Sequence, residues 1–95
     1  MSPRFRLLYS ETCRRQVRTL SPGIKALVKA KIEEIARDPG IGKRLERELS
    51  GYLSCRTKRY RILFKLREEE RTVEIHYVGH RKDIYELLGE QIRKG

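Results

Sequence analysis

Residues 52–79 read YLSCRTKRYRILFKLREEERTVEIHYVG, and apolar and polar side chains alternate along most of this segment. A period of two is typical of a β-strand with one buried face, because successive side chains point to opposite sides. The alternation predicts strands, separated by a tight basic turn and by a longer charged turn, at residues 52–57, 60–66 and 72–79. Connections this short join antiparallel neighbours, so the segment predicts an antiparallel sheet.

Alternation also assigns the side chains to the two faces of this sheet. In the second strand, one face receives Tyr60, Ile62, Phe64 and Leu66. In the third strand, the same rule places Val73, Ile75 and Tyr77 on one face and Glu74, His76 and Val78 on the other. The register matters, because a slip of one residue would move each of these side chains to the opposite face.

The turn between the first two strands sets their register. If Lys58 and Arg59 alone form the turn, Arg56 faces Arg61 on the polar side of the hairpin. Tight hairpin turns favour glycine or asparagine, so a longer loop is the alternative. Facing arginines repel each other and cost stability. An anion held between them would explain the pair, and a solvated face with a charged edge is the other interpretation.

Two helices are predicted ahead of the sheet. A short strand at residues 4–9 leads into Ser10, which has the character of a helix N-cap. Ser21-Pro22 predicts a second start, with the serine as cap and the proline at the first helical position. Apolar residues then recur every three or four positions as far as Asp38-Pro39-Gly40, which ends the helix. Because almost nothing separates the two helices, we expect an antiparallel hairpin.

The remaining segments complete an α+β fold. Residues 40–51 are a charged connection in which Leu45 and Leu49 are the expected apolar anchors, and a last helix is expected from Asp83 to about Arg93. The order is then β-α-α-β-β-β-(α), with the helical hairpin packed on one face of a small antiparallel sheet. A chain of 95 residues fits a single domain, residues 1–95.

The chain is strongly basic, with 23 Lys and Arg against 13 Asp and Glu and a formal net charge of +10. Such an excess attracts polyanions and speeds their association. Nucleic acid is therefore the first candidate partner and an acidic protein the second. A membrane surface is third, because the charge is spread along the chain. No segment has the length of a membrane span or the apolar run of a signal peptide, so we expect a cytoplasmic protein.

The cysteines indicate neither disulfides nor a metal site. Cys13 and Cys55 are too few for a disulfide framework and lack metal-ligand spacing with the two histidines. We therefore expect two buried thiols that act as small apolar side chains, and no metal or other cofactor.

Several segments resemble the RelE/ParE superfamily of bacterial and archaeal toxins. The main ones are Gly79-His80-Arg81-Lys82-Asp83-Ile84-Tyr85 and Tyr60-Arg61-Ile62-Leu63-Phe64, with the spacing between them. The N-terminal strand, the hairpin ending in Asp38-Pro39 and the segment Leu49-Ser50-Gly51 also agree, so the resemblance covers nearly the whole chain. It implies a helical hairpin on a small sheet, and the toxin of a type II toxin–antitoxin system. Its partner would be an acidic, partly helical antitoxin that wraps and neutralises it.

The resemblance implies more than one activity. RelE-like members cleave mRNA in the ribosomal A site without a metal ion, through attack of the ribose 2′-OH on the adjacent phosphodiester. ParE-like members instead inhibit DNA gyrase by protein binding, and a catalytically decayed relative held by its antitoxin is a third reading. The nuclease is favoured here, because a ParE-like toxin would not need a cluster of catalytic side chains.

Residue by residue, the resemblance assigns the catalytic roles. Arg61 matches the phosphate-binding arginine, Arg81 the arginine after the last strand, and Tyr85 the tyrosine that orients or stacks on the substrate. Guanidinium groups suit the charge that gathers on nonbridging phosphate oxygens, and an aromatic ring stacks on an unpaired base. His80 is the candidate general base or acid, with a local role at the strand end as the alternative. His76 is assigned no role.

Further positive charge for RNA is expected from Arg56, Lys58, Arg59 and Lys82, although the two turn residues also suit a solvated edge. For Lys43, Arg44 and Arg47 the alternatives are a supply of charge for ribosomal RNA and a solvated basic face, of which the solvated face is favoured. RelE-like nucleases often carry lysines on the strand before the arginine strand, and here those positions hold Tyr52 and Ser54. This departure leaves open whether the chain cleaves RNA.

Overall fold

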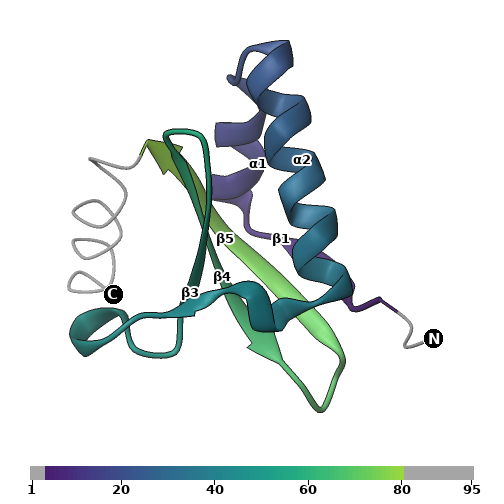
Figure 1. Ribbon diagram of the computed structural model, residues 1–95, viewed down its shortest axis with the longest axis vertical. Helices are drawn as coiled ribbons and strands as arrows, with labels where there is room; N and C mark the ends of the chain where they lie inside the picture. Colours follow the sequence, from purple (N-terminus) through teal and green to yellow (C-terminus); the bar gives the residue numbers. More distant parts are fainter. Residues whose placement is uncertain (1–3, 81–95) are drawn as a thin grey trace.

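The computed structural model describes residues 4–80, in which two helices lie on one side of a five-stranded sheet (Figure 1). The elements are, in chain order, β1 Arg6–Tyr9, α1 Glu11–Arg18, α2 Pro22–Arg37, β2 Lys43–Arg44, β3 Leu53–Thr57, β4 Tyr60–Arg67 and β5 Thr72–His80. Two 3₁₀ turns flank β2, at η1 Pro39–Ile41 and η2 Arg47–Leu49. The predicted α+β class is confirmed, with β2 as an additional strand inside the segment predicted as a connection. The helix expected from Asp83 lies outside the described residues.

The sheet has the strand order β1-β5-β4-β3-β2. The hairpins β3–β4 and β4–β5 are antiparallel as predicted, and Lys58 and Arg59 alone form the first turn. Lys58 adopts a φ of 55°, the left-handed conformation that this tight turn requires at its first position. β1 pairs in parallel with β5, so the sheet is mixed. The sequence had predicted an antiparallel sheet. A tight turn fixes strand direction locally, whereas β1 and β5 meet only through tertiary packing.

The starts of the two helices differ. Ser10 caps α1 as predicted, because its hydroxyl accepts a hydrogen bond from the N–H of Cys13 at 3.0 Å. α2 begins at Pro22, also as predicted, but Ser21 makes no side-chain cap bond. Ser21 therefore occupies the predicted N-cap position without a side-chain bond, and the start of α2 relies on the fixed φ of the proline.

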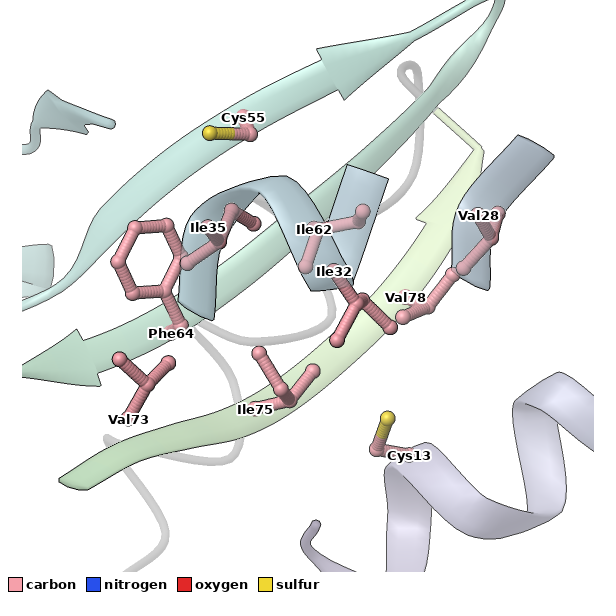
Figure 2. Packing of buried hydrophobic residues seen from close by; sticks show 10 residues of the cluster. All are labelled: Cys13, Val28, Ile32, Ile35, Cys55, Ile62, Phe64, Val73, Ile75 and Val78. Carbon is pink, nitrogen blue, oxygen red and sulfur yellow. The ribbon is translucent and has the colours of Figure 1, made fainter. Parts of the chain in front are cut away.

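The main core lies between the helices and the face of the sheet that they cover (Figure 2). Its buried side chains come from both helices and from β3, β4 and β5: Cys13, Val28, Ile32, Ile35, Cys55, Ile62, Phe64, Val73, Ile75 and Val78. Both thiols are buried, as predicted. Burial raises the pKa of Cys13 to about 11 and also raises the pKa of Cys55, so neither thiol is an activated nucleophile.

A β-bulge in β5 changes the faces that alternation predicts. Phe64 pairs with Ile75, but the residue before Phe64 pairs with Tyr77, which leaves His76 as an extra residue. Beyond the bulge the faces are exchanged, so Val78 joins the main core and Tyr77 lies on the other side of the sheet. The prediction that Tyr77 shares a face with Ile75 is therefore wrong, because one inserted residue advances the alternation by one.

Side chains of α1 bind the backbone of β5 around this bulge. The hydroxyl of Ser10 donates to the carbonyl of His76 at 2.7 Å, and Oε1 of Gln16 accepts from the N–H of Val78 at 2.8 Å. The N–H of Ser10 also donates to the carbonyl of Ile75 at 2.9 Å. α1 therefore follows β1 along the same edge of β5. The hydrogen bonds from this segment satisfy backbone groups of β5 where the bulge interrupts its pairing with β4.

The connection between β2 and β3 covers part of the sheet face away from the helices. Leu45 and Leu49, the anchors that the sequence predicts, pack there together with Tyr52. Their buried partners are Leu63 and Tyr77, and the five residues form a second, smaller apolar cluster. The exchange of faces at the bulge supplies this cluster with Tyr77.

Candidate functional site

The sheet face opposite the helices carries polar side chains between the core positions of β3 and β4. We call it the open face, and its alternating positions on these two strands are Ser54, Arg56, Arg61, Leu63 and Lys65. They point away from the main core because their neighbours in each strand point into it. A functional site on this face is built on strands, and strands hold side chains more rigidly than loops do.

Arg56 and Arg61 are direct cross-strand partners on the open face, as the sequence predicts. The Cβ atoms of such partners lie roughly 4.5–5.5 Å apart. Arg56 is exposed and Arg61 is partly buried. Both side chains are cationic and are neighbours on one face, so an anion that approaches both is attracted by both and relieves their mutual repulsion.

A hollow of about 380 Å³ adjoins the arginine pair at the edge of the sheet. We call it the cationic hollow, and it is lined by Lys31, Glu34, Ile41, Lys43, Ser54, Cys55, Arg56 and Arg61. The hollow forms because β2 pairs with β3 only as far as Ser54, which leaves the rest of β3 as the edge of the sheet. Four cationic side chains and one carboxylate line it, so its net charge favours an anionic ligand.

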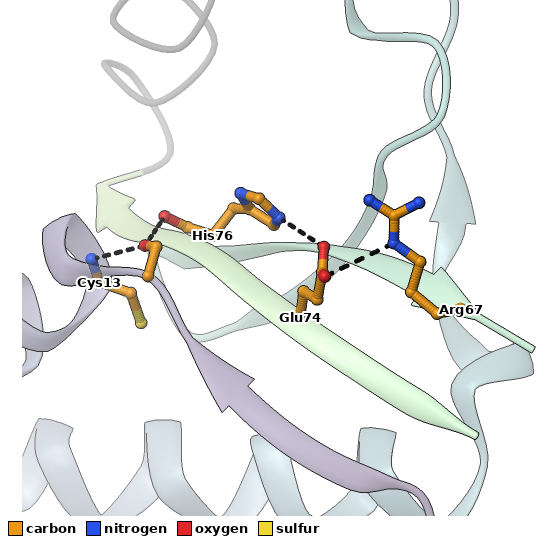
Figure 3. A network of polar contacts seen from close by, with 5 residues as sticks. Cys13, Arg67, Glu74 and His76 are labelled. Carbon is orange, nitrogen blue, oxygen red and sulfur yellow. Dashed lines mark hydrogen bonds and ion pairs between the residues drawn. The ribbon is translucent and has the colours of Figure 1, made fainter. Parts of the chain in front are cut away.

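His76 belongs to a second polar group, on the same face. Its Nε2 lies 3.2 Å from Oε1 of Glu74, and Oε2 of Glu74 lies 3.5 Å from Nε of Arg67 (Figure 3). The ring of Tyr52 meets the imidazole edge-on with the centroids 5.5 Å apart, and Nζ of Lys65 lies 4.6 Å from the Tyr52 ring centroid. The hydrogen bond with His76, and then the charge of Arg67, hold the pKa of Glu74 below its usual value against the opposing effect of desolvation.

Sequence reasoning assigned His76 no role, because a histidine in the middle of a strand carries no signal by itself. The available signal was Glu74 two residues earlier, at the spacing that puts both side chains on one face. The contact with Tyr52, which lies just before β3, has no counterpart in the sequence pattern.

The other residues with predicted roles lie elsewhere. His80 is the last residue of β5 and pairs with Tyr60, with the two ring centroids 5.3 Å apart. Tyr60 shares a face of the sheet with Ile62, whereas Arg61 points to the opposite face. The strands therefore do not bring His80 and Arg61 to the same face. Lys58 and Arg59 are exposed at the β3–β4 turn. The remaining predicted site residues, outside the described part of the chain, are Arg81, Lys82 and Tyr85.

Within residues 4–80, no group of three or more His, Cys, Asp and Glu side chains is arranged to hold a metal ion. None of the helices described in this range combines the length and the apolar character needed to cross a membrane.

Comparison with known proteins gives the family. The sequence model described as "ParE toxin of type II toxin-antitoxin system, parDE" matches residues 5–85. The chain belongs to the RelE/ParE toxin superfamily. This RelE/ParE toxin is also 40% identical over 79 residues to Toxin RelG of Mycobacterium tuberculosis, a match that covers 81% of the chain and 91% of RelG. The resemblance inferred from the sequence is thereby confirmed.

Solved structures agree with this assignment. The toxin–antitoxin complex RelBE2 from Mycobacterium tuberculosis contains a chain that matches with a TM-score of 0.79 and 35% identity, over 87% of this chain and 98% of that one. A variant of E. coli toxin RelE in the free state shares the fold, with a TM-score of 0.76 and 19% identity over 97% and 98% of the two chains. The protein is therefore a RelE/ParE-type toxin of a type II toxin–antitoxin system.

Proposed function

We propose that this toxin is a ribosome-dependent, metal-independent endoribonuclease that cleaves mRNA. The observation that carries the proposal is the pair Arg56 and Arg61, held face to face on the open face beside the cationic hollow. Guanidinium groups bind phosphate oxygens through two parallel hydrogen bonds, so a phosphodiester is a fitting ligand for this pair. The 40% identity to Toxin RelG supports an activity of the RelE type.

The reaction needs no further reactant. The 2′-oxygen of a ribose bonds to the adjacent phosphorus, the bond from phosphorus to the 5′-oxygen breaks, and a 2′,3′-cyclic phosphate and a 5′-hydroxyl form. One proton leaves the 2′-OH and one reaches the departing 5′-oxygen. Negative charge gathers on the nonbridging oxygens in between, where we assign Arg61 and Arg81, and fixed cations stabilise it there. Tyr85 is assigned to stack on a base of the message.

Two histidines are candidates for the proton transfer. The resemblance assigns it to His80, whereas His76 lies on the open face with Arg61 and is oriented by Glu74. A neutral imidazole suits a general base at neutral pH. Cleavage by His76→Gln and by His80→Gln should be compared under the same conditions. The variant that lacks the base should cleave much more slowly than wild type, and the other variant should keep most of the activity.

The direct test is cleavage of mRNA in a translation extract that contains the toxin without an antitoxin. We expect fragments with 5′-hydroxyl ends, and a loss of roughly a hundredfold or more in Arg61→Ala and Arg81→Ala. Lys29→Ala is the matched control, because it removes one positive charge from an exposed position of α2 outside the cationic hollow. Message that stays intact at high toxin concentration would refute the nuclease.

We also propose that a cognate antitoxin with an acidic, partly helical segment binds and neutralises this toxin. Its acidic side chains would complement the net charge of +10. Related chains are found in the RelBE2 complex and in the E. coli RelBE toxin–antitoxin complex. If a short reading frame with an acidic tail lies next to the toxin gene, co-expression of its product with the toxin should yield a complex that abolishes cleavage. Because the proposed target is the translating ribosome, the toxin would act in the cytoplasm.

Inhibition of DNA gyrase by protein binding is the second candidate function. The match to the ParE family model favours it. So does the presence of Tyr52 and Ser54 at two positions where RelE-like nucleases often carry lysines. A gyrase supercoiling assay separates the two functions: blocked supercoiling with intact message would replace the nuclease. If expression harms the host neither by mRNA cleavage nor by gyrase inhibition, the toxin is catalytically decayed.

A further inference from the structure

β2 carries a lysine to the arginine pair. Lys43 pairs with Ser54 across the ladder between β2 and β3, and Ser54 lies two residues before Arg56 on the same face. Residues paired across a ladder point to the same face, so Lys43 extends the row of polar side chains toward the edge of the sheet. It lines the cationic hollow together with Arg56 and Arg61.

α2 carries a second lysine to the same hollow. Lys31 is partly buried, with 27% of its side chain exposed, and its Nζ lies 3.0 Å from Oε2 of Glu34. Both residues line the cationic hollow, and Glu34 is its single carboxylate. An entering anion therefore competes with Glu34 for the ammonium group of Lys31, and is repelled by the carboxylate while the pair is intact.

Ser54 also lines the hollow, and its hydroxyl is buried. Ser54 is only 3% exposed, and its Oγ has no hydrogen-bond partner within residues 4–80. Buried hydroxyls are rarely left without a partner, because the lost hydration costs free energy. The hollow has room for a phosphate group, since its volume of about 380 Å³ corresponds to roughly a dozen water molecules.

We propose that the cationic hollow is a second phosphodiester site, in which Lys31 and Lys43 bind an RNA phosphate neighbouring the one held by Arg61. Glu34 holds Lys31 until RNA enters, and then releases it. The inference rests on the proposed nuclease function, because it describes the path of the same RNA around the edge of the sheet. It predicts that the same charge change alters RNA binding more inside the hollow than outside it, which a diffuse surface charge does not.

The experiment measures the binding of a fluorescent, uncleavable 2′-O-methyl oligoribonucleotide by anisotropy at several salt concentrations. Lys31→Gln and Lys43→Gln should each weaken binding about three- to tenfold and reduce the slope of log K against log salt by about 0.7. Glu34→Gln should tighten binding about two- to fivefold. Lys29→Gln carries the same charge change outside the hollow and should leave the affinity within about twofold. The Lys31–Glu34 pair is at the surface and contributes little to folding, so each variant should fold, as circular dichroism will verify.

A second measurement identifies the source of the phosphate. Cosedimentation with ribosomes reports contacts with ribosomal RNA, whereas the free oligonucleotide represents the message. Weaker binding of Lys31→Gln and Lys43→Gln in either measurement supports the site and names its source. The site is refuted if both variants behave like Lys29→Gln, or if Glu34→Gln does not tighten binding. A refuted site leaves the nuclease standing as long as the wild-type toxin still cleaves mRNA, so the two proposals fail separately.

Discussion

Replacement of Ser10 by alanine should destabilise the toxin by about 2 kcal/mol, because one hydroxyl makes two hydrogen bonds. The N-cap bond from Cys13, at 3.0 Å, is worth about 1 kcal/mol. The bond donated to the carbonyl of His76, at 2.7 Å, is worth about another 1 kcal/mol. Both bonds are partly buried, so water replaces them poorly. For a domain of this size, the loss should lower the melting temperature by about 8–16 °C.

Urea unfolding followed by circular dichroism measures the change, and Ser21→Ala is the matched control. Ser21 occupies the N-cap position of α2 but makes no side-chain cap bond, so its replacement should change the free energy of unfolding by less than about 0.5 kcal/mol. Equal losses in the two variants, or a loss below about 0.5 kcal/mol for Ser10→Ala, would show that α1 does not stabilise the bulge through this hydroxyl.

Three further predictions concern acid stability, thiol reactivity and packing. The pKa of Glu74 lies below its ordinary value of 4.5 in the folded state, chiefly through the hydrogen bond with His76. The stabilisation is therefore present above the unfolded pKa and is lost as the pH falls through the folded pKa. Glu74→Gln should flatten the acid side of the stability curve in urea titrations from about pH 6 to about pH 3. If the wild type and the variant lose stability in parallel, the carboxylate makes no such contribution. The thiol of Cys13 has a pKa of about 11, so at about pH 8 it should react with a disulfide reagent only when the protein unfolds. Rapid labelling of the native protein would contradict its burial. Gly42→Ala should destabilise by about 1–3 kcal/mol, because the added Cβ would lie 2.5 Å from Cζ of Phe64. Phe64→Leu in that background should recover part of the loss in thermal unfolding, and a neutral Gly42→Ala would show that the ring can move aside.

Features that depend on neighbouring residues could be predicted from the sequence alone. A period of two and the tight turn at Lys58–Arg59 are local properties, and they were enough to place Arg56 opposite Arg61. The N-cap at Ser10 and the start of α2 at Pro22 are local as well, since a helix begins where the first turn can satisfy its own N–H groups.

Which distant segments of the chain contact each other could be seen only in the folded structure. Tyr77 and Val78 are both apolar, so alternation alone could not reveal the bulge that exchanges their faces. Ser10 and Gln16 stabilise this bulge through hydrogen bonds to residues more than sixty positions later in the sequence. The same holds for the cationic hollow, where Lys31 from α2 and Lys43 from a two-residue strand join Arg61. A hydrophobic pattern specifies which face of each element is buried, but packing selects the element it is buried against, and that choice assembles the candidate site.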